Sequence, residues 1–60
     1  MDKFTVKEYA NRYDIPLSYG EIVIITALIA DCFIRNELDY EFKNGVPAFD
    51  IETLQEYFII

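Results

Sequence analysis

The sequence predicts one small α+β domain, mostly helical, in which two helices joined by a short turn precede a β-hairpin and a C-terminal helix. Thr5 and Ser18 are each followed three residues later by a glutamate, the spacing of an N-terminal capping box, and so predict two helix starts. Asn44-Gly45 follows an alternating apolar and polar segment, which predicts the hairpin. A chain of 60 residues forms one domain at most, here residues 1–60.

The first helix is expected from about Val6 to Tyr13. Its apolar side chains recur at helical spacing and form a single inward stripe, made by Val6, Tyr9, Ala10 and Tyr13. Asp14-Ile15-Pro16 ends the helix, because the residue before a proline is disfavoured in the helical conformation.

The second helix is expected from near Tyr19 to Arg35-Asn36, and it is apolar on almost every side. A helix of this kind must be covered all round, and so short a chain has few other elements to cover it. Its roughly 13 apolar residues fall short of the roughly 20 that cross a bilayer, so no membrane span is expected. We expect a helix that contributes to the core and also to an interface with a partner.

The hairpin has a self-consistent register if Asn44-Gly45 is a two-residue loop. Phe42 then pairs with Pro47 and Tyr40 with Phe49, which makes one face aromatic. The other face carries Glu41, Lys43, Val46 and Ala48. Pro47 cannot donate a ladder hydrogen bond and indicates an edge strand.

A last helix is expected from Ile51 to about Phe58, with Asp50 as its N-terminal cap. Its inward stripe consists of Ile51, Leu54, Tyr57 and Phe58.

The composition limits which metal, cofactor or catalytic sites the chain can form. The net charge is −6, histidine is absent and Cys32 is the single cysteine, so we expect no metal site and no cofactor, and Cys32 is interpreted as a small buried hydrophobe. The acidic residues of the C-terminal third, Asp50 among them, do not build a cleft in which an acid and a base could be paired, so an enzyme is not expected. The N-terminus carries no leader, so a cytoplasmic location is expected.

Two segments resemble a known family. Thr5 to Pro16 resembles the opening T-x-x-E-x-A helix and turn of the excisionase and MerR-like winged helix-turn-helix domains, and Asn36 to Phe58 looks like their wing and closing helix. The resemblance implies a winged-helix fold and an origin in a phage or mobile element. The second helix departs from the family, because Arg35 at its far end is its one cation, whereas a helix that enters the major groove needs polar and basic side chains.

The first functional hypothesis is a small acidic protein-binding regulatory module, an adaptor, inhibitor or antirepressor that occludes a partner's surface. Its anchor is one of two faces of the second helix, the face of Ile22, Ile25, Ile29 and Phe33 or the opposite edge of Ile24 and Leu28. Acidic side chains would steer it to a basic or nucleic-acid-binding protein; the candidates are Asp39, Glu41, Glu52 and Glu56.

The alternative is an excisionase-like DNA-binding protein. Phosphate contacts would come from Lys3, Lys7, Arg12, Arg35 and Lys43, and Asn44 of the wing would reach the minor groove. A homodimer packed through the second helix is compatible with both hypotheses.

Overall fold

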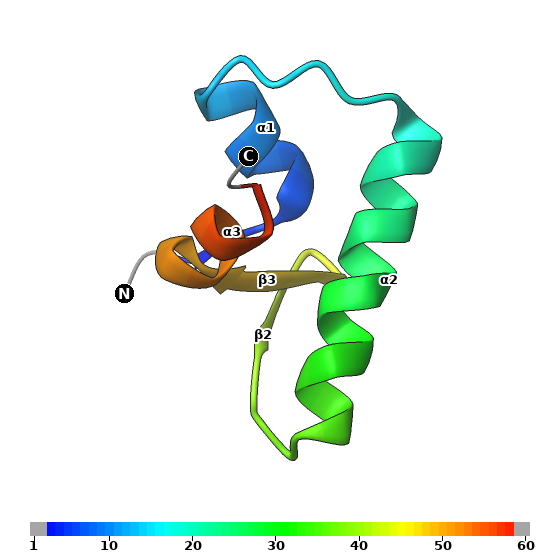
Figure 1. Cartoon of the computed structure of the whole chain (residues 1–60), viewed down its shortest axis with the longest axis vertical. Coiled ribbons are helices and arrows are strands. Elements are labelled where there is room, and N and C mark those ends of the chain that lie inside the picture. Colours follow the sequence, from blue (N-terminus) through cyan, green and yellow to red (C-terminus); the bar gives the residue numbers. More distant parts are fainter. Residues whose placement is uncertain (1–2, 59–60) are drawn as a thin grey trace.

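Three helices and a three-stranded antiparallel sheet make up the computed structural model, which describes residues 3–58. The elements are β1 (Lys3–Phe4), α1 (Val6–Arg12), α2 (Tyr19–Arg35), β2 (Glu41–Lys43), β3 (Val46–Asp50) and α3 (Ile51–Phe58). Figure 1 shows α2 standing along one side of the molecule, with α1 and α3 on the other side and β3 between them. The mostly helical α+β class predicted from the sequence is confirmed.

Both predicted helix starts are confirmed as complete capping boxes. The Thr5 hydroxyl accepts from the Glu8 backbone N–H at 3.1 Å, and the Thr5 N–H donates to Glu8 Oε1 at 3.0 Å. Ser18 and Glu21 repeat the arrangement at 3.2 and 2.8 Å. Each box satisfies two backbone donors that a helix leaves free at its N-terminus.

The helix ends also follow the sequence closely. α1 stops at Arg12, one residue before the predicted end, and Asp14 in the turn has a positive φ of 54°. α2 stops at Arg35, where the Asn36 side chain donates from Nδ2 to the Cys32 carbonyl at 2.8 Å. The Asn36 backbone N–H donates to the same carbonyl at 3.1 Å, so the backbone and side chain of Asn36 both close the helix end.

The hairpin has the predicted register, with Phe42 opposite Pro47 and the rings of Tyr40 and Phe49 5.5 Å apart. Asn44 and Gly45 have φ values of 53° and 79°, the two positive values that a type I′ turn requires.

The sheet has a strand that the sequence did not predict. β1 pairs with the end of β3, Lys3 opposite Asp50 and Phe4 opposite Phe49, so the strand order is β1-β3-β2. β3 is therefore the central strand, and the prediction of an edge strand is wrong. Pro47 is tolerated because β1 reaches only the last two residues of β3, which leaves Pro47 with a neighbouring strand on one side.

Asp50 is the last residue of β3, and its Oδ1 forms an ion pair with Lys3 Nζ at 2.9 Å. The residue predicted to cap α3 thus joins the two strands. Ala48 was expected on the same hairpin face as Glu41, Lys43 and Val46. It is fully buried, so that face is covered at this position of β3.

The core draws on each larger element. A buried cluster joins Val6 and Tyr9 of α1 to Ile29 of α2, Phe49 of β3 and Leu54 of α3. Three aromatic residues expected to face inward are exposed instead: Tyr13 and Tyr57 of the helix stripes, each 45% exposed, and Phe42 of the aromatic hairpin face, 61% exposed. Tyr13 follows the last residue of α1, so its ring leans on Tyr9, with centroids 4.8 Å apart, rather than entering the core.

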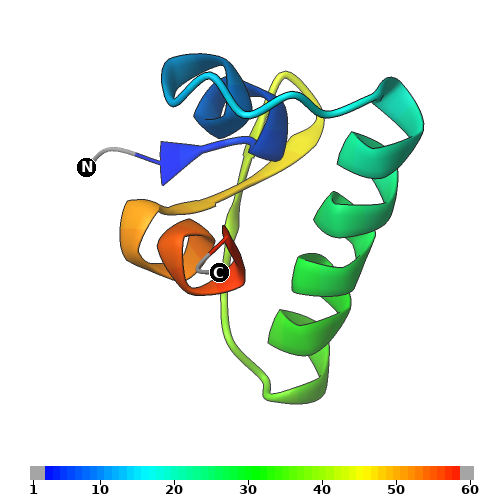
Figure 2. The same cartoon turned by 45° about the horizontal axis from the view of Figure 1, so that its top comes forward.

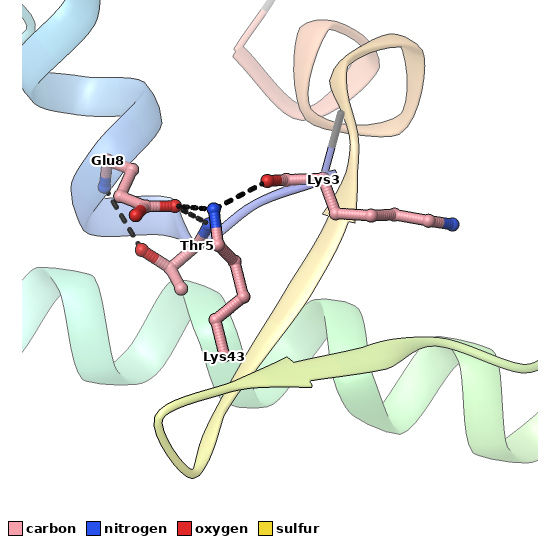
Figure 3. A network of polar contacts seen from close by, with 4 residues as sticks. All are labelled: Lys3, Thr5, Glu8 and Lys43. Atoms are coloured by element: carbon pink, nitrogen blue, oxygen red, sulfur yellow. Dashed lines mark hydrogen bonds and ion pairs between the residues drawn. The ribbon is translucent and has the colours of Figure 1, made fainter. Parts of the chain in front are cut away.

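Lys43 fastens the hairpin to the N-terminal part of the chain. Its Nζ donates to the Lys3 carbonyl and to Glu8 Oε1, both at 3.0 Å, while the Lys3 side chain points away from this network (Figure 3). One side chain therefore connects β2, β1 and α1. The hairpin lies against the domain rather than projecting freely.

Candidate functional site

The two sides of α2 have different surroundings. On the inner side, Ile29 has no exposed surface and Ile22, Ile25 and Phe33 pack against the core cluster. On the opposite side Ile24, Leu28 and Ile34 are 60, 61 and 63% exposed. We call this side the outer face of α2; its exposed residues are Gly20, Val23, Ile24, Ala27, Leu28, Asp31, Ile34 and Arg35.

The two anchors proposed from the sequence differ in exposure. Ile29 cannot contact a partner, because the core covers it completely, and the prediction that it binds one is wrong. Ile22, Ile25 and Phe33 are half-buried members of the same inner side. Ile24 and Leu28 are the anchor candidates that present most of their surface to solvent. The rotated view in Figure 2 shows the side of α2 away from the sheet with no other element over it.

A groove of about 530 Å³ continues the outer face toward the sheet. It runs between α2 and the start of β3, and Val23 and Ala27 belong to both the groove and the outer face. The remaining lining is mostly apolar and consists of Thr5, Lys7, Tyr19, Ile22, Thr26, Ala30, Val46 and Pro47. Apolar surface is therefore continuous from the outer face of α2 to the hairpin.

Charges on α2 stand near its two ends. Arg35 is the one cation between Tyr19 and Arg35, and its Nε lies 2.9 Å from Asp31 Oδ2 one turn earlier. Glu21, in the first turn, uses Oε1 for its capping box. The middle of the outer face, from Val23 to Leu28, carries no charge.

The carboxylates proposed to steer a partner are exposed but lie away from α2. Asp39 precedes β2, Glu41 lies in β2, and Glu52 and Glu56 lie in α3. The structure does not bring them together with Ile24 and Leu28 on one helix face. They contribute to the acidic field of the whole molecule.

Three of the five cations proposed for DNA contact are already in ion pairs within residues 3–58: Lys3 with Asp50, Arg35 with Asp31, and Lys43 with Glu8. Lys7 lines the apolar groove, and Asn44 is exposed in the hairpin turn.

Two of these cations converge on the ring of Phe4. The Arg12 Cζ lies 5.7 Å and the Lys43 Nζ 5.9 Å from its centroid, within the range of cation–π attraction. They line a second groove of about 410 Å³ together with Asn11 and Glu8. The Glu8 carboxylate offsets part of this positive charge.

Hydrogen bonds and ion pairs together shift two pKa values. The backbone N–H of Thr5, and then the Lys43 ammonium, stabilise the charged carboxylate and lower the pKa of Glu8 below its ordinary value of 4.5. The hydrogen bond to Asp50 raises the pKa of Lys3 above 10.5. Both shifts hold the paired groups in their charged forms at neutral pH.

Cys32 is half-buried rather than buried, because it lies at the edge between the two sides of α2. A hydrogen bond with Cys32 raises the pKa of Tyr57 on α3, and Asn36 Nδ2 lies 3.5 Å from the sulfur. Within residues 3–58, no group of three His, Cys, Asp or Glu side chains is placed to hold a metal ion. None of the helices described is long and apolar enough to cross a membrane.

Sequence reasoning missed part of the outer face. Val23, Ala27 and Ile34 were not among the anchor candidates, although each is exposed on the outer face. A sequence signal for this face was present, since Gly20, Ile24, Ala27, Asp31 and Ile34 follow one another at spacings of 4, 3, 4 and 3 residues, the repeat of a helix seam.

Comparison with known proteins gives no match among protein-family models, curated proteins or solved structures.

Proposed function

We propose that this chain is a small acidic protein-binding module that uses the outer face of α2 to cover an apolar surface of its partner. One observation carries the proposal: Ile24, Leu28 and Ile34 are each at least 60% exposed on one side of a helix whose other side builds the core. Contiguous exposed apolar side chains of this kind mark interaction sites on soluble proteins.

The energetics of this face favour an interface. Burying an exposed isoleucine or leucine is worth about 1.5–3 kcal/mol, and these side chains are already about 40% covered, so each would add about 1–2 kcal/mol on binding. Three such residues along one helix side form the anchor of a helix-in-groove or helix-on-helix contact. The groove beside β3 widens the apolar area that a partner can fill.

A regulatory role by occlusion is part of the proposal. The order of two helices, hairpin and closing helix is the order implied by the resemblance to excisionase-like winged-helix domains, which supports a relation to mobile-element regulators. In such a domain the second helix would meet DNA. Here its outer face is apolar, which suits a protein surface instead, and the net charge of −6 would speed association with a basic partner.

DNA binding is the second candidate, and one observation favours it. Arg12 and Lys43 converge beside the exposed groove at Phe4, where a phosphate could be contacted. Against it, the outer face of α2 has no cation before Arg35, and the net charge opposes approach to a polyanion.

Affinity capture from an extract of the native cells tests the first candidate. We expect a retained protein that is lost with the double variant Ile24→Asp/Leu28→Asp while the circular dichroism of the helices is unchanged. Asn11→Asp/Gln55→Asp adds the same charge at exposed positions elsewhere and should retain the protein. Equal capture by all three chains would show that the outer face of α2 is not the binding surface.

Fluorescence anisotropy of a labelled duplex at about 50 mM salt tests the second. We expect no binding at high micromolar protein. Salt-sensitive binding that disappears in Arg12→Gln/Lys43→Gln would favour the DNA-binding function instead.

A further inference from the structure

We propose that the outer face of α2 binds a second copy of this chain, with the two helices antiparallel about a two-fold axis that passes beside Leu28. The inference rests on the proposed function only in using the same face. It adds the identity of the partner and the geometry of the contact.

The position of the two-fold axis follows from the spacing between Glu21, Leu28 and Arg35. Glu21, Leu28 and Arg35 are seven residues apart in sequence, and seven residues are close to two helical turns, so the three lie along one edge of α2. Each charge stands about 10 Å from Leu28 along the helix, in opposite directions. Leu28 is 61% exposed at the midpoint.

Charge complementarity selects the antiparallel arrangement. A two-fold axis at Leu28 places Leu28 against Leu28 of the second copy and brings Glu21 opposite Arg35 twice. A parallel pair would set Glu21 beside Glu21 and Arg35 beside Arg35, which is unfavourable. The contacts within the chain engage one oxygen of Glu21 and one nitrogen of Arg35, so both groups retain further hydrogen-bonding capacity.

The outer-face residues between Glu21 and Arg35 have the spacing of a helix seam. Ile24, Ala27, Asp31 and Ile34 repeat at 3 and 4 residues, the pattern by which two helices interlock. Asp31 is the polar member, and the Arg35 guanidinium 2.9 Å away compensates its charge, so the seam does not bury an isolated carboxylate. Ala27 is small and lets the larger side chains of the second copy approach the helix.

The size of the face sets the expected strength. α2 has 17 residues and is about 25 Å long, so one helix face buries less than the roughly 800 Å² per partner of a standard interface. Two chains of charge −6 also repel each other. We therefore expect micromolar self-association that strengthens when salt screens the repulsion, whereas an interface with a basic partner would weaken.

Sedimentation equilibrium or light scattering of the full chain from about 10 µM to 1 mM tests the pair. The wild type should pass from monomer to dimer, and Leu28→Asp should raise the dissociation constant at least about 100-fold while leaving the helical signal intact. Glu21→Gln keeps the capping box and loses the charge, so it should weaken the dimer about three- to tenfold.

A mixing experiment tests the antiparallel register. Glu21→Arg and Arg35→Glu should each be monomeric alone, because like charges then face each other across the axis. An equimolar mixture should form a heterodimer in which both charge pairs are restored. Glu52→Arg and Arg12→Glu make the same charge changes at exposed positions outside the seam and should dimerise unaided.

Two results would overturn the inference. One is a wild type that stays monomeric at 1 mM, and the other is a dimer for which the charge-reversed mixture gives no heterodimer. If the wild type does not self-associate but captures a protein whose binding requires Ile24 and Leu28, the proposed function stands without this inference. Loss of both would remove the two proposals together.

Discussion

The inner and outer sides of α2 both carry large aliphatic side chains but have opposite surroundings. Ile29 on the inner side is fully buried, whereas Ile24 and Leu28 on the outer side show about three-fifths of their surface to solvent. Isoleucines occur on both sides. The difference arises because the sheet, α1 and α3 all lie on one side of the helix (Figures 1 and 2). The apolar sequence of α2 thus shows that the helix needs to be buried. The positions of the sheet, α1 and α3 determine which of its two sides is buried within the domain.

The largest difference in stability between the two sides is expected when an aspartate is placed on each. Ile29→Asp should unfold the domain, because an unpaired buried carboxylate costs several kcal/mol and small domains have little stability to lose. Ile24→Asp should remain folded and lose about 1 kcal/mol or less, mainly through helix propensity. Urea titration followed by circular dichroism measures both. Equal losses of stability would mean that the two sides are equally buried.

Removal of methyl groups without added charge gives a finer measure. Ile29→Ala should cost about 2–5 kcal/mol and Ile29→Val about 0.5–1.5 kcal/mol, as expected for a core position. Ile24→Ala on the outer side should cost less than Ile29→Val, since little contact is lost there. A larger cost for Ile24→Ala, measured by the same urea titration, would place that side chain in a packed environment.

The capping box of α2 should matter less than its inner side. Ser18→Ala removes the hydroxyl that accepts from the Glu21 N–H and should cost about 1 kcal/mol. Ser18→Asp, which also accepts this hydrogen bond, should be nearly neutral. Thermal unfolding of the two variants provides the comparison. No difference between alanine and aspartate at this position would show that the cap adds nothing to stability.

The smallest effect is expected where Lys43 meets Glu8. The lowered pKa of Glu8 means that its contribution is complete above about pH 4.5 and is lost as the pH falls through the folded-state pKa below that value. Glu8→Gln keeps the capping box and removes the ion pair, so it should cost about 0.5 kcal/mol or less at pH 7 and low salt. Its stability should also fall less steeply than that of the wild type between pH 5 and 3. Parallel slopes in urea titrations at several pH values would mean that the Thr5 N–H and Lys43 do not stabilise the Glu8 carboxylate in the folded state.

Local signals predicted the helices and the hairpin well. Thr5, Ser18 and the Asn44-Gly45 turn each act over a few residues, and the structure places helix starts and turn where these residues indicate. The periodicity of α3 and the pairing of Phe42 with Pro47 are similarly local.

Contacts between distant parts of the chain were not predictable in this way. β1 is two residues long, and a strand this short has no periodicity to detect. Its pairing with β3 engages Asp50, so the predicted helix cap becomes a partner of Lys3. The apolar composition of α2 showed that the helix needs covering, but only the packed fold shows that Ile29 faces inward and Ile24 outward.

The pairing of β1 with β3 has a consequence for synthesis. Lys3 and Phe4 pair with Asp50 and Phe49, so the sheet joins two segments that lie far apart in the sequence. On the ribosome, the helices can begin to form as they emerge, but the sheet cannot close until residue 50 has cleared the exit tunnel. The domain should therefore reach its native state only after both strands have left the tunnel, with the apolar helix exposed to chaperones until then.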